Sequence, residues 1–286
     1  MSYHSPTSIN EAVALLASRD DARPMSGGTD LLVQMRSGRI RPGAIIDIKG
    51  LERATGSRRA DGGFVIGAAT PCTDLLLDEA LCAAWPGVVE AANLIGSVQV
   101  RNRATIGGNL CNASPAADSV PALIAADARC VVAGPGGERS VPVADLLAGP
   151  GRTTLGKGEF VLEILLPARQ PRSGDAYLRS IPRTEMDIAV VGAGVDLSCD
   201  VDGVCMAARV ALGAVAPTAL LVPDAGAALI GTRLEESALD AMGEAVKAAC
   251  RPIDDKRGTI DYRIAMSAVY ARRATAIAYQ RAREAV

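Results

Sequence analysis

The segment RNRATIGGNLCNASPAAD, from Arg101 to Asp118, holds the most specific pattern in this sequence. At its centre lies TIGGN, positions 105–109, where two adjacent glycines are flanked by hydroxyl and amide side chains. Adjacent glycines allow positive φ angles and bring successive backbone N–H groups close to a ligand without an intervening Cβ atom. Such a loop suits a diphosphate group, to which Thr105 and Asn109 can add side-chain hydrogen bonds.

A second glycine pair lies in SGGTD, positions 26–30, between a short predicted strand and a predicted helix. A helix N-terminus behind such a loop adds favourable partial positive charge for an anion, and Thr29 offers another hydroxyl group. Either loop alone is most simply an ordinary tight turn. Two such loops in one chain favour a dinucleotide cofactor, without specifying which one.

A third glycine pattern, VGAGV at positions 191–195, resembles the start of a Rossmann fingerprint. The third glycine of that fingerprint would fall at position 197, which is Leu197, and no helical pattern follows. We therefore interpret this run as a strand that needs small residues for close packing.

Composition excludes several classes of function. With 286 residues, of which 49% are apolar, the chain is long enough for two or three compact units. No apolar run approaches the roughly 18–20 residues that span a bilayer, and charged residues interrupt any signal-peptide core near the N-terminus. We therefore expect a cytoplasmic protein. A dispersed net charge of −2 and 3% aromatic residues indicate neither a nucleic-acid nor a polybasic membrane surface.

The cysteines and the single histidine offer no metal site. No cysteine pair forms a C-x-x-C motif, so neither a zinc site nor an iron–sulfur site is expected. His4 is the only histidine, and we expect it at a frayed end. Redox chemistry in this chain would therefore require a bound organic cofactor. The seven cysteines are Cys72, Cys82, Cys111, Cys130, Cys199, Cys205 and Cys250.

The hydrophobic pattern predicts an α+β protein. Ser8 and Glu11 form a capping box that opens the first helix. A small βαβ-like unit over about residues 1–55 then precedes a larger α+β unit over about residues 60–170. In the first unit the pattern predicts one helix over 8–18 and a second that follows the glycine loop and ends at about residue 35. It also predicts strands over 23–25 and 44–48. In the second it predicts strands over 64–68, 130–133 and 161–166, and helices over 73–84, 88–95 and 118–126.

Residues 167–174 are polar, contain proline and glycine, and form the best linker in the sequence. After the linker, three strands and then helices predict a separate α+β domain with a three-stranded antiparallel sheet. We therefore expect two domains, residues 1–170 and 175–286. The second domain has predicted strands over 176–181, 188–197 and 204–212, a turn over 200–203, and helices over 235–250 and 262–284.

The two glycine loops and the segment from Arg101 to Asp118 closely resemble the flavoprotein subunits of the xanthine dehydrogenase and carbon monoxide dehydrogenase family of molybdenum hydroxylases. The resemblance covers nearly the whole chain. It implies that residues 1–170 form an FAD-binding domain and residues 175–286 a flavoprotein C-terminal domain. It also implies an electron-transfer subunit that performs no substrate oxidation alone and passes electrons from partner [2Fe–2S] clusters to an external acceptor.

The same resemblance implies which residues contact FAD. Asp118 matches an aspartate that binds the adenosine-side ribose, which suits a carboxylate accepting two hydroxyl donors. From the sequence alone Asp118 is also a candidate helix N-cap, and both roles are compatible. Leu162 matches an apolar contact to FAD. The loop residues carried over are Arg23, Met25, Ser26, Gly27, Gly28, Thr29, Asp30, Leu31, Ala104, Thr105, Gly107, Gly108 and Asn109.

Two further positions follow from the resemblance. Arg179 matches a basic position near the flavin ring, where a cation would favour the reduced, anionic flavin. Many relatives carry lysine there, and a solvated strand charge is the alternative interpretation. Ile95 occupies a place where some relatives stack an aromatic ring on the flavin, a contact that isoleucine cannot make.

The resemblance also implies partner chains: a small subunit with two [2Fe–2S] clusters and a large subunit with the molybdenum cofactor, assembled as a dimer of heterotrimers. A self-contained FAD-dependent oxidoreductase with its own substrate pocket is the alternative. Such enzymes carry a positioned acid, base or covalent flavin tether, for which His4 is a poor candidate. A structural subunit that has lost FAD is a third hypothesis, against which the intact glycines of both loops argue.

Overall fold

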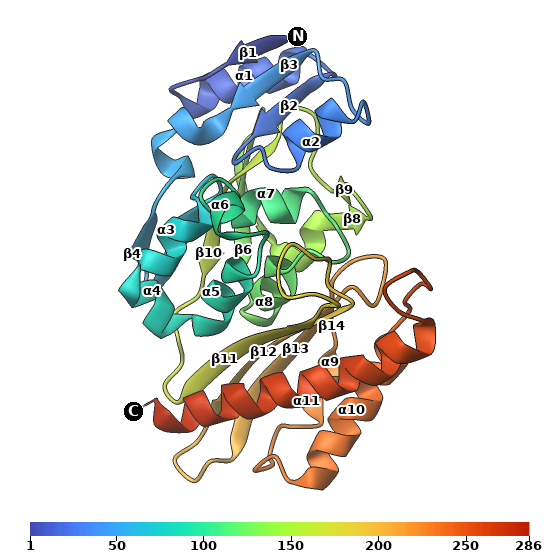
Figure 1. The fold of residues 1–286 in the computed structure, drawn as a ribbon. Helices are drawn as coiled ribbons and strands as arrows, with labels where there is room; N and C mark the ends of the chain where they lie inside the picture. The colour runs from blue at the N-terminus through green and yellow to red at the C-terminus, as the bar shows by residue number, and fades with distance from the viewer. Residues whose placement is uncertain (286) are drawn as a thin grey trace.

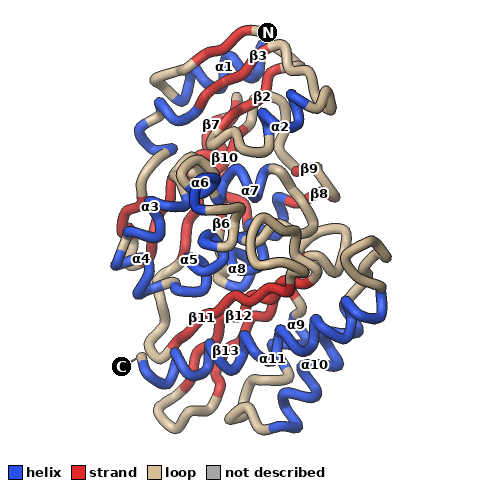
Figure 2. The backbone as a smooth tube through the Cα atoms, in the orientation of Figure 1, coloured by secondary structure: helices blue, strands red, loops and turns tan. Residues whose placement is uncertain are grey.

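The computed structural model describes residues 1–285. Three larger β-sheets follow one another along the molecule, each accompanied by helices (Figure 1). The N-terminal sheet lies at one end, the central sheet follows, and the C-terminal sheet lies at the other end beside two long helices (Figure 2). Helices and strands are interspersed throughout, so the predicted α+β class is confirmed.

The N-terminal sheet is parallel and has the strand order β1-β3-β2. Helices connect its strands, which confirms the βαβ-like character predicted there. Ser8 accepts a hydrogen bond from the Glu11 N–H at 3.2 Å and caps α1, as the capping box predicts. The elements are β1 (Ser2–His4), α1 (Ile9–Ser18), β2 (Ala22–Met25), α2 (Leu31–Arg36) and β3 (Ala44–Asp47).

The expectation that His4 lies at a frayed end was wrong. His4 belongs to β1 and pairs with Ile46 of β3, and its Nε2 atom lies 3.0 Å from Ser2 Oγ. A strand of three residues is too short to produce a readable hydrophobic period. The parallel pairing with the buried strand β3 supplies the order that this short run does not encode by itself.

The central sheet is antiparallel, with the strand order β4-β5-β10-β6-β7. The edge strands β4 and β7 were not predicted, because both are polar and largely exposed and neither alternates cleanly. The strands are β4 (Ser57–Ala60), β5 (Gly63–Gly67), β6 (Arg129–Gly134), β7 (Gly137–Pro142) and β10 (Phe160–Leu166), with a two-stranded ladder of β8 (Leu147–Gly149) and β9 (Arg152–Thr153) beside them.

Short helices accompany the central sheet. The helix predicted over 73–84 is two helices, because Asp78 ends the first and its carboxylate accepts the Leu81 N–H at 3.0 Å to cap the second. The α-helices are α3 (Cys72–Leu77), α4 (Glu79–Ala84), α5 (Pro86–Asn93), α6 (Val98–Arg101), α7 (Ile106–Cys111) and α8 (Ser119–Ala125), and the 3-10 helices are Ile48–Gly50, Glu52–Ala54 and Val143–Leu146.

The C-terminal sheet has four antiparallel strands, not the three predicted. The missed strand, β14, has two residues and pairs with the end of β13, so no period could reveal it. At the turn before β13, Asp200 Oδ1 accepts the N–H groups of Asp202 and Val204. The elements are β11 (Ser173–Ser180), β12 (Val191–Cys199), β13 (Cys205–Gly213), β14 (Leu220–Leu221), α9 (Pro223–Ala227), α10 (Glu236–Ala249) and α11 (Ile260–Glu284).

The C-terminal sheet is covered on both faces. Helix α11 lies across β11 and β12, and α8 of the preceding part of the chain packs against β12 and β13 (Figure 1). The glycines of β12 allow this approach, since a Cβ atom at Gly194 would lie 2.7 Å from the Pro121 backbone. The run over 191–195 is therefore a closely packed strand, as interpreted from the sequence, and not a Rossmann loop.

Polar contacts also join the C-terminal sheet to the helices of the central part. Asp175 of β11 accepts the Val88 N–H at 3.1 Å, and so caps α5, whose own N-cap residue, Trp85, makes no side-chain cap. Arg169, between β10 and β11, lies 4.2 Å from the Trp85 ring and pairs with Asp196 at 2.6 Å. The predicted linker is thus ordered by an aromatic contact and an ion pair.

Candidate functional site

The two glycine loops meet at one cavity of about 540 Å³ between the N-terminal and central sheets. This volume lies in the range of small-molecule and cofactor sites, about 300–1,000 Å³. The loops are far apart in sequence: the first follows β2, and the second consists of the N-cap and first turn of α7. Of the predicted contacts, the cavity is lined by Arg23, Met25, Ser26, Gly27, Gly28, Thr29, Asp30, Leu31, Ala104, Thr105, Gly107, Gly108 and Asn109.

The loops touch each other as well as the cavity. A Cβ atom at Gly27 would lie 1.8 Å from the Arg103 carbonyl oxygen, so only glycine permits this approach. Beyond the contact, Gln34 Nε2 donates to Asn112 Oδ1 at 3.0 Å. These contacts place the two glycine pairs on one continuous surface.

The first loop presents backbone donors to the cavity. Gly28 has φ of 78°, a value that glycine adopts without strain. The N–H groups of Gly27 and Gly28 have no hydrogen-bond acceptor among the described residues. Successive free N–H groups in a turn form an anion-binding concavity. This part of the site therefore fits a phosphate oxygen, as the sequence predicts.

The second loop is the capped start of α7. Thr105 Oγ1 accepts the Gly108 N–H at 2.9 Å, so this hydroxyl oxygen is used within the loop. Asn109 Oδ1 accepts from both the N–H (3.2 Å) and the hydroxyl (2.7 Å) of Ser119. The amide oxygen of Asn109 thus holds the start of α8, which leaves its NH₂ group as the donor available to a ligand.

Three predicted site residues lie outside the cavity lining. Leu162 is fully buried beneath the N-terminal part of the fold. Asp118 Oδ2 accepts from Arg179 Nη1 at 2.6 Å, and Tyr177 Oη donates to Asp118 Oδ1 at 3.2 Å. The resemblance assigned Asp118 and Arg179 to opposite ends of the cofactor, whereas the structure places them in direct contact.

The two sequence alternatives for this pair have different outcomes. Asp118 occupies the N-cap position of α8, as expected, but its side chain makes no capping hydrogen bond because it turns toward Arg179. Arg179 is not a solvated strand charge, since its side chain is only 4% exposed. Burial raises the pKa of Asp118 to about 6, although Arg179 and Tyr177 both favour the charged carboxylate. The Nε of Arg179 is buried without a partner among the described residues.

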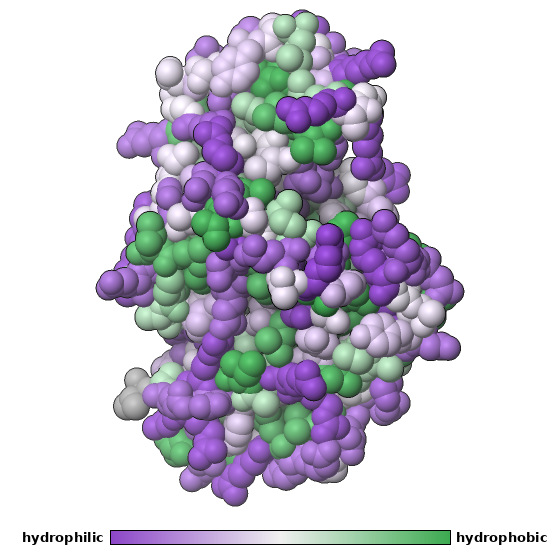
Figure 3. Space-filling model, viewed as in Figure 1, coloured by the Kyte–Doolittle hydropathy of each residue, from purple (hydrophilic) through white to green (hydrophobic). Residues whose placement is uncertain are grey.

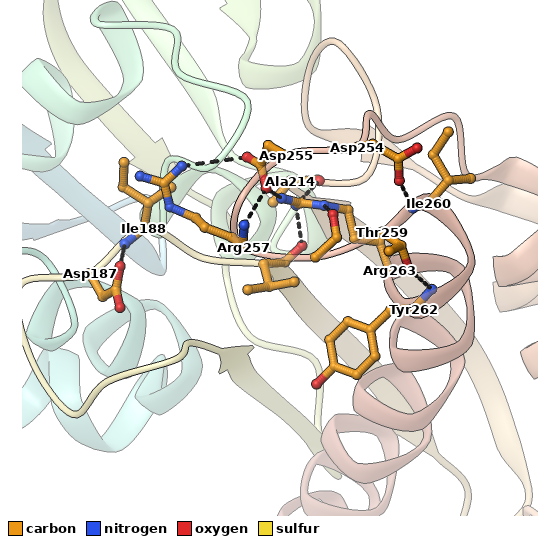
Figure 4. Close-up of polar contacts among 12 residues, drawn as sticks. Asp187, Ile188, Ala214, Asp254, Asp255, Arg257, Thr259, Ile260, Tyr262 and Arg263 are labelled. Atoms are coloured by element: carbon orange, nitrogen blue, oxygen red, sulfur yellow. Dashed lines mark hydrogen bonds and ion pairs between the residues drawn. The ribbon is translucent and has the colours of Figure 1, made fainter.

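The segment 181–190, which connects β11 to β12, is anchored from behind by a buried arginine (Figure 4). Arg263 at the start of α11 is 3% exposed, and its Nη1 donates to the carbonyl oxygens of Val190 at 2.7 Å and Ala214 at 3.1 Å. The Ala214 N–H in turn donates to Pro115 O at 2.7 Å. The end of this segment is therefore held in register with the residues that follow the second glycine loop.

Sequence reasoning missed a third wall of the cavity, residues 153–161. Within it, Lys157 Nζ pairs with Asp20 Oδ1 at 2.7 Å across to the segment before β2. A cation between two glycines, Gly156 and Gly158, was the available signal in the sequence. Ile95 also lines the cavity, so the position noted for its lack of an aromatic ring does belong to this site.

The described residues offer little for metal or thiol chemistry. Among residues 1–285, no group of three or more His, Cys, Asp or Glu side chains is arranged to hold a metal ion. Cys111 lines the cavity, but burial raises the pKa of its thiol to about 12, so it stays protonated at neutral pH. None of the helices described is both long and apolar enough to cross a bilayer.

The fold and cavity define an α+β protein with a site for a diphosphate-bearing cofactor. Residues 1–169 match the family described as the FAD binding domain in molybdopterin dehydrogenase, and residues 176–278 match the CO dehydrogenase flavoprotein C-terminal domain. The chain therefore belongs to the family of FAD-binding subunits of molybdenum hydroxylases, which confirms the resemblance seen in the sequence.

Individual relatives agree with this assignment. The chain is 37% identical to the carbon monoxide dehydrogenase medium chain of Hydrogenophaga pseudoflava, over 98% of this chain and 97% of the relative. It is 32% identical to the xanthine dehydrogenase FAD-binding subunit of Escherichia coli O157:H7, over 92% and 90%. A solved carbon monoxide dehydrogenase structure from H. pseudoflava superposes with a TM-score of 0.94 at 38% identity, over 98% of both chains.

Proposed function

We propose that this chain holds one FAD between its two glycine loops and passes electrons from partner [2Fe–2S] clusters to an external acceptor. The observation that carries the proposal is the contact between the loops, which turns free backbone N–H groups and an asparagine amide toward one cavity. Bound flavin accepts electrons singly or in pairs, which suits a step between one-electron clusters and a two-electron acceptor.

Different residues of the cavity are suited to contact different parts of FAD. The N–H groups of Gly27 and Gly28 and the NH₂ group of Asn109 are hydrogen-bond donors suited to the diphosphate. Ile95, which also lines the cavity, contributes an apolar surface. The remaining loop positions carried over from the resemblance are proposed as contacts along the same cofactor.

We assign Asp118 and Arg179 together to the flavin end. Their ion pair argues against roles at opposite ends of an extended cofactor, and Arg179 belongs to β11 of the C-terminal sheet, outside the lining of the cavity between the glycine loops. In this arrangement Asp118 sets the charge that Arg179 presents, rather than binding the adenosine ribose as first expected. Leu162 contributes through the buried core behind the site rather than as a lining residue.

Partner chains follow from the named relatives, which are a medium chain and an FAD-binding subunit of larger enzymes. We propose a small [2Fe–2S] subunit, a large molybdenum-cofactor subunit and a dimer of heterotrimers. Apolar side chains are exposed over α2 (Figure 3), where Leu32 and Val33 are 53% and 63% exposed, and a partner surface would cover them. The domain division at 170–175 and the cytoplasmic location remain predictions.

The proposal is tested with the purified chain and with the assembled complex. The chain is expected to be yellow and to release FAD, not FMN, on acid treatment, because no covalent tether is assigned. A complex lacking this chain should still reduce its clusters with substrate but stall in electron transfer to the acceptor. Substrate turnover by the isolated chain would instead support the self-contained oxidoreductase, and a colourless chain that does not take up FAD would overturn the proposal.

A further inference from the structure

A lysine lies behind the first glycine loop, on the side away from the cavity. Lys49 belongs to the 3-10 helix that directly follows β3, the strand paired with β2. Its Nζ donates to the Ser26 carbonyl oxygen at 3.0 Å and to Asp47 Oδ1 at 2.6 Å. The side chain is 27% exposed, and Lys49 is not among the residues that line the cavity. Its ammonium group therefore contacts the loop through the Ser26 carbonyl without lining the cavity.

The carbonyl that accepts this hydrogen bond belongs to the same peptide unit as the Gly27 N–H. Because that unit is planar, a cation at its oxygen polarises the N–H at the opposite end and makes it a stronger donor. The same bond fixes the orientation of the unit, since a flipped peptide would turn the Ser26 oxygen toward the cavity. An anion there would then meet a carbonyl oxygen in place of a donor.

The position of Lys49 is itself determined by Asp47, whose side chain is 8% exposed. Asp47 accepts hydrogen bonds from Lys49 Nζ, from the Lys49 N–H at 3.0 Å and from the Tyr3 hydroxyl. Burial raises the pKa of Asp47, but the hydrogen bonds from Lys49 and Tyr3 outweigh it and hold the pKa below its ordinary value. The carboxylate stays charged at neutral pH and keeps the ammonium group beside Ser26.

We infer that Lys49 is a positioning residue for the diphosphate of FAD: through the Ser26 carbonyl it orients and strengthens the Gly27 N–H. The inference deepens the proposed function and rests on it. It assigns a binding role to a residue that does not line the cavity, and it makes the charge of Lys49, not its packing, the property that matters.

The test compares substitutions of Lys49 in the full chain, with FAD affinity measured by flavin fluorescence. Lys49→Met is expected to raise the Kd for FAD about tenfold or more, the size of a lost hydrogen bond to a charged group. Lys49→Arg keeps the charge and should stay within about threefold of the wild type. Lys49→Gln, which keeps a donor but no charge, should fall between them. Lys247→Met, on the surface of α10, is the matched control and should bind FAD normally.

A purely structural role is excluded by a second readout. The ¹⁵N and ¹H shifts of the Gly27 amide in the folded chain should move in Lys49→Gln and return in Lys49→Arg, because they report the bond at the preceding carbonyl. If Lys49→Met does not fold, the double variant Asp47→Asn/Lys49→Met removes the uncompensated carboxylate and should still bind FAD weakly.

The outcomes distinguish a failure of the proposed function from a failure of the role assigned to Lys49. A wild-type chain that binds no FAD would overturn the proposed function. If the wild type binds FAD and Lys49→Gln binds it equally well with an unchanged Gly27 amide, only the role of Lys49 is overturned. Equal loss of affinity in Lys49→Arg and Lys49→Met would also overturn it, since charge would then not be the determining property.

Discussion

Gly27 is the residue at which the two halves of the site depend most directly on each other. Its Cα faces the Arg103 carbonyl, and an added Cβ would lie 1.8 Å from that oxygen. Gly27→Ala must therefore push the loops apart, and we expect most of the bound FAD to be lost. The measurement is the ratio of flavin to protein absorbance after purification.

The matched control is Gly136→Ala, where a Cβ meets nothing within 4 Å and φ is not positive. This variant should keep its full flavin content. Normal flavin content in Gly27→Ala would show that the loops tolerate separation and that their contact is not needed for binding.

Asn109 combines a structural role with the binding role proposed for its amide donor. Asn109→Asp keeps an oxygen to accept the Ser119 N–H and hydroxyl, but replaces the amide donor with negative charge. We expect a folded chain with an unfolding temperature within a few degrees of wild type and FAD affinity reduced about a hundredfold or more, since a carboxylate would face phosphate. Isothermal titration of FAD with thermal unfolding checks both parts, and tight binding would contradict the donor role.

At the scale of single residues, the sequence indicated which residue types belong to the site, but not the direction in which several of their side chains point. The glycines of both loops were predicted to belong to one site because adjacent glycines let backbone donors approach a ligand, and the structure brings both pairs to one cavity. The use of the Thr105 hydroxyl as a cap and the contact of Asp118 with Arg179 were not, because each depends on where a side chain turns. A resemblance matches positions along the chain, whereas the ion pair depends on two segments meeting in space.

Among the secondary-structure elements, α5 depends on a residue of another sheet for its cap. Asp175 is 3% exposed, and burial raises its pKa to about 7, with Arg169 and the Val88 N–H opposing. A carboxyl group with a raised folded-state pKa stabilises the fold below its unfolded pKa, and this stabilisation is lost as the pH rises through the folded value. For Asp175 the loss falls between about pH 4 and pH 7.

Asp175→Asn removes this titration while retaining an oxygen for the Val88 N–H. Relative to wild type, the variant should gain on the order of 2–4 kcal/mol of unfolding free energy between pH 4 and pH 8. Urea denaturation of both proteins across this range provides the measurement. Parallel pH dependence in the two proteins would mean that Asp175 stays ionised throughout.

The elements found from sequence are those with a long or strongly apolar pattern. The strands β10, β12 and β13 and the helix α11 were predicted close to their observed bounds, because the strands are long and largely apolar and α11 repeats buried positions along 25 residues. The strands β1, β4, β7 and β14 were missed, since they are short or polar edge strands whose pairing is set by a neighbour. Local pattern cannot report a partner that lies far away in sequence.

For the whole molecule, the close approach of α8 to the C-terminal sheet is the contact whose effect on stability we test. A Cβ atom at Gly194 would lie 2.7 Å from the Pro121 backbone. Gly194→Ala should therefore cost about 1–3 kcal/mol, as overpacked interiors do, and lower the unfolding temperature by several degrees. Gly243→Ala in α10 is a control with the opposite expected sign. Its Cβ atom would meet only Ala268 at 3.6 Å, and the substitution should stabilise the folded protein by about 0.5–1 kcal/mol. Calorimetry of both variants measures these changes in stability. A Gly194→Ala variant as stable as the wild type would show that α8 can shift to make room for the added Cβ atom.

The contact between Gly27 and the Arg103 carbonyl also has a kinetic consequence. If the diphosphate of FAD lies between the two loops, local opening of the junction between the N-terminal and central sheets provides a route for its release. The rate at which this junction opens then contributes to the residence time of FAD, beside the bonds made to the cofactor. Two variants of equal affinity can therefore differ in how long they retain FAD after dilution.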